Sequence, residues 1–188
     1  MIVIEKETAA DAAAIESLLD IGFGGGRLSK TVYTLRQGPS VPSLSLVART
    51  GFDAKLGASI RFWRCDVKSD GDEILPALVL GPLVVDPSLQ GKGLGRTLVA
   101  RALEEADQEG WGLCLVVGEA SYYSPYGFVL AEPYGFELPG PVDQPRFQVR
   151  AAPDLLQGLA EEPMVRKVLP WSGKASGVEG AKDAFRAA

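Results

Sequence analysis

Residues 83–96, which read Leu-Val-Val-Asp-Pro-Ser-Leu-Gln-Gly-Lys-Gly-Leu-Gly-Arg, decide the fold of this chain. The first three residues end an apolar run that predicts a strand, and Asp-Pro-Ser interrupts it. Glycine then alternates with other residues before a helical pattern begins. N–H groups at the start of a helix are free to bind phosphate oxygens, and glycine lacks the Cβ atom that would hold a diphosphate away from the backbone. The stretch therefore predicts a strand, a tight turn and a helix that together bind a diphosphate.

The segments on either side of this turn predict a parallel βαβ unit. Residues 74–85 are nearly all apolar, as in a central strand that is covered on both faces. Residues 93–107 carry apolar side chains at 94, 98, 102, 103 and 106, which share one face of a helix, and Gly110 ends that helix. Residues 113–117 form the next apolar run. Because a helix between two strands returns the chain in its original direction, we expect these strands to lie parallel.

The rest of the chain mixes short helices and strands. We expect strands at residues 2–5, 43–49, 56–67 and 147–150, with the second and third forming a hairpin around a turn at 50–53, and a further turn at 69–72. Thr8 is a suitable cap for a helix over 9–19, and residues 29–36 predict a second short helix. Residues 122–128 are expected to form a loop or a short helix. The predicted fold class is mixed α/β, in a single domain.

Composition limits the classes of function. The chain has 188 residues, of which 46% are hydrophobic and 23% charged, and these values fit one globular domain. The net charge of −5 argues against nucleic acid as a partner. No apolar run is long enough to span a membrane, and the N-terminus lacks the layout of a secretory signal. Because Cys65 and Cys114 lie in apolar stretches, as buried reduced thiols do, we expect a cytoplasmic protein with no membrane partner.

The chain contains no histidine. Ser-His-Asp and Cys-His arrangements of nucleophile and base therefore cannot be assembled, and a zinc site would have to combine two cysteines with carboxylates. We expect no metal, and chemistry that depends on carboxyl, phenol, hydroxyl, amine or backbone groups.

Two familiar phosphate-binding motifs do not match the glycine-rich turn. A phosphate loop that hydrolyses nucleotides needs Ser or Thr after Gly-Lys, where this chain has glycine. The dinucleotide fingerprint needs a third glycine where this chain has arginine. The pattern that matches is Gln-x-x-Gly-x-Gly, in Gln90, Gly93 and Gly95, and it resembles the coenzyme A signature of the GNAT superfamily of N-acetyltransferases. A plain glycine-rich helix start is the alternative interpretation.

A second motif supports the resemblance. Residues 121–128, Ser-Tyr-Tyr-Ser-Pro-Tyr-Gly-Phe, look like the Tyr-x-x-x-Gly-Phe element of that superfamily, with Tyr123 in the tyrosine position. The doubled tyrosine, Pro139-Gly140-Pro141 and Arg146-Phe147-Gln148 resemble a branch of bacterial predicted acetyltransferases. The resemblance is strongest over residues 79–148, agrees in the order of elements over 1–78 and is weak beyond 150.

The resemblance implies a GNAT-like domain over residues 1–170, followed by a C-terminal tail, 171–188, that could dock on it. The implied fold has a mixed central sheet flanked by helices, with a splayed pair of parallel strands that admits the arm of coenzyme A. The implied reaction moves an acyl group from acetyl-CoA to a small-molecule or protein amine, which attacks the thioester directly in a ternary complex. A homodimer is compatible with such a domain.

The resemblance also implies roles for residues. The backbone of Leu83, Val84 and Val85 would pair with the pantetheine arm, and an N–H near Val84 or Val85 would polarise the thioester carbonyl. Tyr123 would be the general acid that protonates the departing thiolate, with a core tyrosine bonded to backbone as the alternative. The other expected coenzyme-binding positions are Gln90, Gly91, Lys92, Gly93, Leu94, Gly95 and Arg96.

The general base is left open. Many members of the superfamily carry a glutamate on the central strand, but residues 77–85 of this chain contain no acid. Glu119, just after the next strand, is the nearest candidate base, although a solvated carboxylate or helix cap is a simpler role for it, and a water chain could serve instead. Tyr122 and Tyr126 are expected to pack or to form a pocket wall.

Other functions stay open on the sequence alone. The same fold could serve as a non-catalytic acyl-CoA-binding or regulatory domain, and the same turn could bind a nucleotide or another phosphate. Transfer to a hydroxyl group is a further alternative. In such folds the acceptor is held by two loops, residues 22–37 and the region after Phe128, and neither has a readable code here.

Overall fold

The computed structural model describes residues 2–69 and 74–173. Within these residues, nine strands form one mixed sheet in the order β1-β2-β3-β4-β5-β8-β6, with β9 paired to β3 and β7 paired to β9. The strands are β1 (Ile2–Lys6), β2 (Leu46–Thr50), β3 (Lys55–Lys68), β4 (Ile74–Val85), β5 (Leu113–Val117), β6 (Val129–Leu130), β7 (Phe136–Glu137), β8 (Phe147–Ala151) and β9 (Arg166–Pro170). The α-helices are α1 (Ala12–Phe23), α2 (Leu94–Gln108), α3 (Ala120–Tyr123) and α4 (Pro153–Glu161). The 3₁₀ helices are η1 (Ala9–Asp11), η2 (Gly25–Ser29), η3 (Thr31–Leu35), η4 (Pro87–Leu89), η5 (Ser124–Tyr126), η6 (Glu132–Tyr134) and η7 (Gln144–Arg146).

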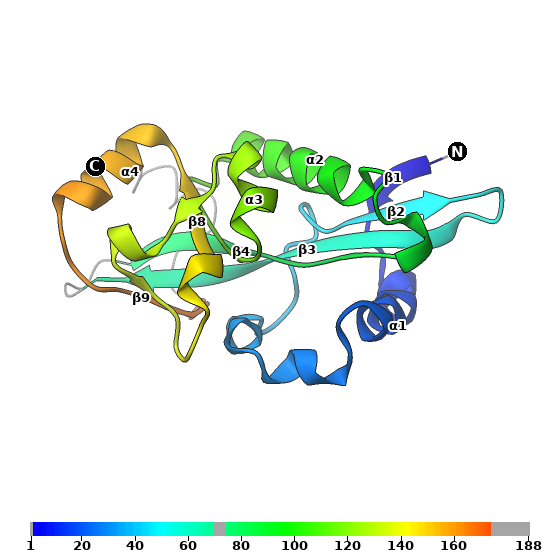
Figure 1. Ribbon diagram of the computed structural model, residues 1–188, viewed down its shortest axis with the longest axis horizontal. Coiled ribbons are helices and arrows are strands. Elements are labelled where there is room, and N and C mark those ends of the chain that lie inside the picture. Colours follow the sequence, from blue (N-terminus) through cyan, green and yellow to red (C-terminus); the bar gives the residue numbers. More distant parts are fainter. Residues whose placement is uncertain (1, 70–73, 174–188) are drawn as a thin grey trace.

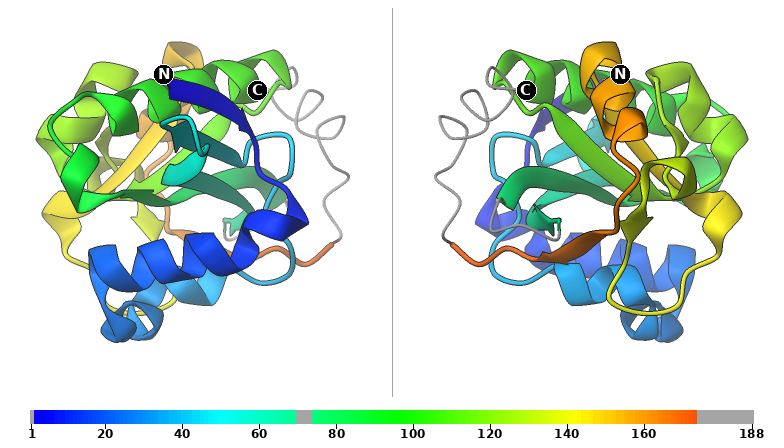
Figure 2. Two further views of the ribbon diagram at one scale, coloured as in Figure 1. Left: turned by 90° about the vertical axis from the view of Figure 1, so that its right-hand side faces the viewer. Right: turned by 90° about the vertical axis from the view of Figure 1, so that its left-hand side faces the viewer.

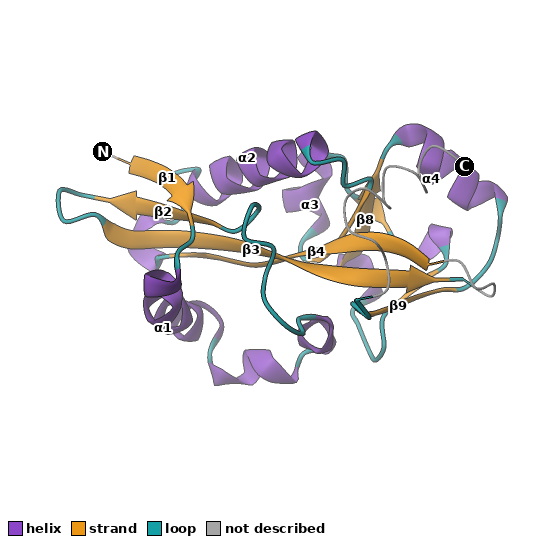
Figure 3. Ribbon diagram, turned by 180° about the vertical axis from the view of Figure 1, so that it is seen from behind, coloured by secondary structure: helices purple, strands orange, loops and turns teal. Residues whose placement is uncertain are grey.

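Helices cover both faces of the central strands. α2 and α3 lie on one face, whereas α1, η2 and η3 lie on the other (Figure 1; seen from behind in Figure 3). End-on views show the sheet between α1 and α2 (Figure 2). On the face that α1 covers, Ile15 and Leu18 of α1 pack with Val84 of β4. The apolar face predicted for residues 93–107 is confirmed, because the buried residues of α2 are Leu94, Gly95, Leu98, Val99, Ala102, Leu103 and Ala106.

An irregularity near the end of β4 opens the centre of the sheet. Ile60 of β3 pairs with Leu83 and Phe62 pairs with Leu80, so that β4 has one more residue than β3 over this stretch. The two residues of β4 inside this bulge are Gly81, at φ 116°, and Pro82. A bulge of this kind bends its strand, and proline cannot donate to the ladder.

β4 and β5 form the parallel pair that the sequence predicts. They are in register only at Leu78 with Cys114 and at Val79 with Leu115. Beyond these positions β4 continues to Val85 without β5 as a partner, so the two strands diverge at their carboxyl ends. The predicted splayed pair is therefore present in the fold.

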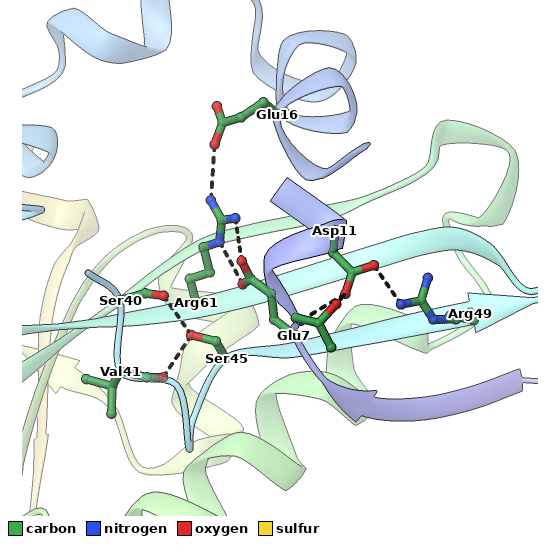
Figure 4. Close-up of polar contacts among 9 residues, drawn as sticks. Glu7, Asp11, Glu16, Ser40, Val41, Ser45, Arg49 and Arg61 are labelled. Atoms are coloured by element: carbon green, nitrogen blue, oxygen red, sulfur yellow. Dashed lines mark hydrogen bonds and ion pairs between the residues drawn. The ribbon is translucent and has the colours of Figure 1, made fainter. Parts of the chain in front are cut away.

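Ion pairs of the buried Arg61 attach α1 to the sheet (Figure 4). Arg61 of β3 is 9% exposed and donates to both carboxylate oxygens of Glu7, at 2.8 and 2.6 Å, and to Glu16 of α1, at 3.1 Å. Glu16 also accepts from Arg27 of η2 at 2.8 Å. Because a buried guanidinium is costly unless it is paired, this series of contacts fixes α1 and η2 relative to β3.

The structure corrects part of the expected layout. The hairpin of β2 and β3, the late strand β8 and the helix after Thr8 are confirmed. Residues 29–36 do not form one short helix but parts of two 3₁₀ helices, because Lys30 between them has an extended backbone at φ −73° and ψ 138°. α4 and β9 were not predicted. The turn at 69–72 and the tail at 171–188 fall largely outside the described residues.

Two sequence-based expectations concern the cysteines and membrane-spanning helices. Cys65 and Cys114 are buried and free, as expected. Among the described residues, no helix has both the length and the apolar character needed to cross a membrane.

Candidate active site

The start of α2 is open. Gly91 and Gly93 have φ of 76° and 79°, in the left-handed region that favours glycine, and Gly93 caps the helix without a bond from any side chain. A Cβ atom at either glycine would meet no atom within 4 Å. Helix geometry leaves the first N–H groups, those of Leu94, Gly95 and Arg96, without an acceptor inside the helix. These amides, at the positive end of the helix dipole, can bind an anion.

The turn before α2 is held by hydrogen bonds among its own residues. Asp86 accepts from the N–H of Ser88 at 2.9 Å and from its hydroxyl at 2.7 Å, which lowers the pKa of the Asp86 carboxyl. Gln90 donates to the carbonyl of Val85 at 3.3 Å, and Lys92 donates to that of Ser88 at 3.3 Å. Asp86 is therefore a turn residue, and Gln90 and Lys92 shape the approach to the helix start.

The end of β4 presents free backbone groups to the gap beside β5. The N–H of Asp86 donates to Gly57 of β3 at 2.8 Å. Because backbone groups alternate in direction along an antiparallel ladder, Val84 also faces β3, whereas Leu83 and Val85 turn their N–H and C=O away from β3. The side chain of Val84 is buried against α1. The backbone edge available to a ligand is therefore that of Leu83 and Val85.

A cavity of about 540 Å³ occupies the region where β4 and β5 diverge. This volume suits a small ligand or part of a larger one. Its walls come from η2 and η3, the bulge of β4, the end of β5, α3, and the segment before β8. The lining residues are Phe23, Arg27, Ser29, Lys30, Thr31, Val32, Tyr33, Arg36, Leu80, Gly81, Pro82, Leu83, Val116, Val117, Gly118, Glu119, Tyr122, Tyr123, Pro141, Val142, Asp143 and Arg146.

Tyr123 contributes a buried phenol to this cavity. The residue is 8% exposed, and its ring packs edge-on against Tyr122 and Phe128, with ring centres 5.0 and 5.6 Å apart. The ring lies so close to Gly118 that a Cβ atom there would be 2.2 Å from it. Burial raises the pKa of Tyr123 well above its ordinary value of 10.0. In the described part of the chain no hydrogen bond involves the hydroxyl, so the phenol is a neutral proton donor without a partner.

Tyr122 connects the helix start with the cavity. Its hydroxyl lies 2.8 Å from where a Cβ atom of Gly95 would be, and the residue also lines the cavity. The guanidinium of Arg96 lies 5.9 Å from the centre of the Tyr122 ring. Tyr126 donates its hydroxyl to the carbonyl of Arg96 at 3.2 Å. The two tyrosines therefore hold the first turn of α2 next to the cavity.

Glu119 lies at the cavity but in contact with solvent. Its side chain is 69% exposed and pairs with Arg146 at 3.1 Å. Its carbonyl accepts the N–H groups of Tyr122 and Tyr123, so the residue begins α3. Asp143 is a second exposed carboxylate among the lining residues. The structure thus brings Glu119 and Tyr123 to one cavity, and the role of Glu119 as base stays a prediction.

Sequence reasoning assigned residues 22–37 to an acceptor loop but did not single out Arg36 within it. Arg36, directly after η3, lines the cavity, and its guanidinium carbon lies 4.1 Å from the centre of the Tyr33 ring. Burial lowers the pKa of Arg36 to about 10. No local motif marks this residue. The bulge of β4 next to Arg36 could be predicted from the sequence, because Gly81-Pro82 within an apolar strand is typical of a break in the hydrogen-bonded pairing of strands.

Comparisons with known proteins agree with this geometry. Residues 43–130 match a family model described as an acetyltransferase (GNAT) domain. The chain is 32% identical to the uncharacterized N-acetyltransferase YhbS of Escherichia coli K12 over 157 residues, which cover 83% of this chain and 91% of YhbS. It is 31% identical to the uncharacterized N-acetyltransferase YjhQ of the same organism over 163 residues, covering 86% of this chain and 85% of YjhQ.

Two solved structures have a similar fold. The crystal structure of E. coli YhbS in complex with CoA matches with a TM-score of 0.70 and 30% identity, over 89% of this chain and 88% of that one. A GNAT family acetyltransferase from Brucella melitensis in complex with acetyl-CoA matches with a TM-score of 0.60 and 24% identity, over 92% of this chain and 97% of that one. The Brucella protein shows likeness of fold alone.

Proposed function

The chain belongs to the GNAT family of N-acetyltransferases, and from this premise we propose that it binds acetyl-CoA and transfers the acetyl group to an amine by direct attack in a ternary complex. One observation carries the proposal: Leu83 of the free β4 edge and the phenol of Tyr123 line a single cavity where β4 and β5 diverge, and Tyr122 connects this cavity to the open start of α2. Binding of CoA by the relative YhbS supports the choice of coenzyme.

The coenzyme extends from the helix start into the gap. Its diphosphate accepts hydrogen bonds from the amides of residues 91–96, with Lys92 and Arg96 adding positive charge. The pantetheine arm pairs with the outward backbone groups of Leu83 and Val85, as an added strand would. Val84 of β4 faces β3 and holds this edge against it, Gln90 shapes the turn, and Leu94 anchors the helix. The thioester then lies beside Tyr123.

Transfer of the acetyl group removes two protons from the nitrogen of an ammonium acceptor and supplies one proton to the coenzyme sulfur. An alkylammonium has a pKa of about 10.4, so the acceptor first loses a proton, to Glu119 or to water. The free amine attacks the thioester carbon, the new C–N bond forms, and the C–S bond breaks. The nitrogen, which is positively charged after the attack, loses its second proton to water. An outward N–H of β4 stabilises the carbonyl oxygen as it gains charge. Tyr123 gives its proton to the thiolate and is reprotonated from solvent.

One observation favours a second candidate function, a non-catalytic acyl-CoA-binding domain. Residues 77–85 contain no acid, and the carboxylates that line the cavity, Glu119 and Asp143, are exposed. A protein without a positioned base could bind the coenzyme and never turn it over. Turnover therefore has to be measured separately from binding.

The test combines binding with turnover. Calorimetry with acetyl-CoA, CoA, ATP and NAD should give tight binding only for the first two, because only these place a pantetheine arm along β4. Thiol release from acetyl-CoA, followed with a panel of amines and alcohols, should require an amine. Binding of ATP or NAD without binding of acetyl-CoA or CoA would refute the proposed coenzyme. Binding of acetyl-CoA without amine-dependent thiol release would favour the second candidate.

A further inference from the structure

Of the arginines that line the cavity, Arg36 is the one that pairs with no acidic side chain of the described residues. The Nε and Nη1 atoms of Arg36 are buried and have no hydrogen-bond partner among the described residues. Its Nη2 atom lies 3.0 Å from where a Cβ atom of Gly81 would be, so the guanidinium sits against the bulge of β4. The ring of Tyr33 covers it on one side, with 4.1 Å between the guanidinium carbon and the ring centre.

The other arginines at the cavity already have acidic partners. Arg27 pairs with Glu16 at 2.8 Å and also with Asp20. Arg146 pairs with Glu119 at 3.1 Å. Within residues 2–69 and 74–173, none of the recorded ion pairs includes Arg36. A half-buried charge without an acidic partner is unfavourable, and an anionic ligand that reaches it would lower that cost.

The position of Arg36 places such a ligand on the acceptor side. α2, whose start would hold the diphosphate, lies on one face of the sheet, and η3 lies on the opposite face (Figure 1). The coenzyme therefore enters the gap from the side of α2, and Arg36 reaches the gap from the other side. Thr31 of η3 donates its hydroxyl to the carbonyl of Pro141, which closes the two acceptor-side segments around this end of the cavity.

We propose that Arg36 binds a carboxylate of the acceptor, and that the acceptor is therefore a small amine that carries its own carboxylate, such as a free amino acid. This inference rests on the proposed function, because it names the class of amine that the same site acetylates. A guanidinium binds a carboxylate through two parallel hydrogen bonds, which fixes both the position and the orientation of the ligand.

A carboxylate held beside Gly81 orients the amine of the same molecule toward the thioester in the gap between β4 and β5. Amines without an anionic group leave Arg36 unpaired, so polyamines and the lysine side chains of proteins are poor acceptors. The acidic net charge of the whole chain, −5, does not set this preference, because the guanidinium of Arg36 lines the cavity itself.

The experiment compares amino acids with their amides, which keep the α-amine but lack the carboxylate. Acetylation of a set of free amino acids and of the matching amino-acid amides is measured with the full chain and with Arg36→Gln. For the unaltered chain, we expect kcat/KM to be about 10- to 100-fold higher for the acid than for the amide. In Arg36→Gln this preference should disappear, because the KM for the acid rises while the KM for the amide stays the same.

Arg101→Gln is the matched control, because it removes the same charge from the exposed face of α2. It should keep the preference of the unaltered chain. Calorimetry with acetyl-CoA should give the same affinity for all three proteins, which shows that Arg36→Gln is folded. Equal use of acids and amides by the unaltered chain, or a preference that survives Arg36→Gln, would overturn the inference.

A binding arm separates this inference from the proposed function. The product analogues N-acetyl amino acid and N-acetyl amino-acid amide are titrated into the chain saturated with CoA. If no amine is acetylated but the N-acetyl acid binds more tightly than its amide and loses this advantage in Arg36→Gln, the transferase proposal fails and the carboxylate site stands. If amines are acetylated and neither the binding of the N-acetyl compounds nor the use of the substrates depends on Arg36, the transferase proposal stands and the carboxylate site fails.

Discussion

At the scale of single residues, the site depends on polar atoms of Tyr123 and Arg36 that have no hydrogen-bond partner within the described part of the chain. The Tyr123 phenol is buried among aromatic rings, and the Arg36 guanidinium lies against Gly81. A sequence can mark the first of these, because Tyr123 belongs to a local motif with Gly127 and Phe128. It cannot mark the second, because Arg36 meets Gly81 only when η3 folds across the bulge of β4.

Tyr123→Phe should lower kcat by roughly 10²-fold or more while leaving the affinity for acetyl-CoA unchanged, since the variant removes only the proton donor. Thiol release and calorimetry measure the two quantities. Tyr134→Phe, which alters a tyrosine outside the cavity lining, serves as the control and should retain full activity. Unchanged kcat in Tyr123→Phe would show that water protonates the thiolate instead.

The pH dependence of the same reaction follows from the state of the phenol. Because burial raises the pKa of Tyr123 above 10.0, the phenol keeps its proton below that pH. The rate should therefore rise with pH as the acceptor amine loses its proton, and it should show no decline up to pH ~10. A descending limb near neutral pH that vanishes in Tyr123→Phe would contradict this assignment.

At the scale of elements, the unit β4–α2–β5 brings the site together. Its apolar runs and its helical period are local and strong, so the sequence predicts β4 and β5 to the residue and α2 to within a residue at each end. β9 was not predicted because its five residues, which include Lys167 and Pro170, form a strand by pairing with β3, about a hundred positions earlier, and with β7. Short strands of this kind depend on partners distant in the sequence.

Gly95→Ala tests the contact between α2 and Tyr122. The new Cβ atom would lie 2.8 Å from the Tyr122 hydroxyl and 3.2 Å from Val85, so we expect a loss of about 1 kcal/mol in the free energy of unfolding and a weaker affinity for acetyl-CoA. Gly158→Ala, in α4, is the matched control. Its Cβ atom meets nothing within 4 Å, so stability should rise by about 0.5–1 kcal/mol with unchanged affinity. Chemical denaturation measures the free energy of unfolding, and calorimetry measures the affinity for acetyl-CoA. Equal changes in both quantities for the two variants would show that Gly95 is not a contact position.

At the scale of the whole molecule, the cavity exists because two irregularities coincide. The bulge in β4 turns its end away from β5, and the pairing of the two strands stops after Val79 and Leu115. The family resemblance predicts such a gap. It also assigns the acceptor side to residues 22–37 and the region after Phe128, but it does not predict the side chains that line it, because η2, η3 and the segment before β8 come from separate parts of the chain and carry no shared pattern. The boundary at residue 170 and the docking of the tail stay predictions.

A crystal structure of the chain with bound CoA tests the central claim most directly. The account predicts diphosphate oxygens within about 3 Å of the backbone nitrogens at the start of α2, and a thiol that points through the gap toward the Tyr123 hydroxyl. A diphosphate bound away from that helix start, or a sulfur atom on the far side of β5 from Tyr123, would contradict it.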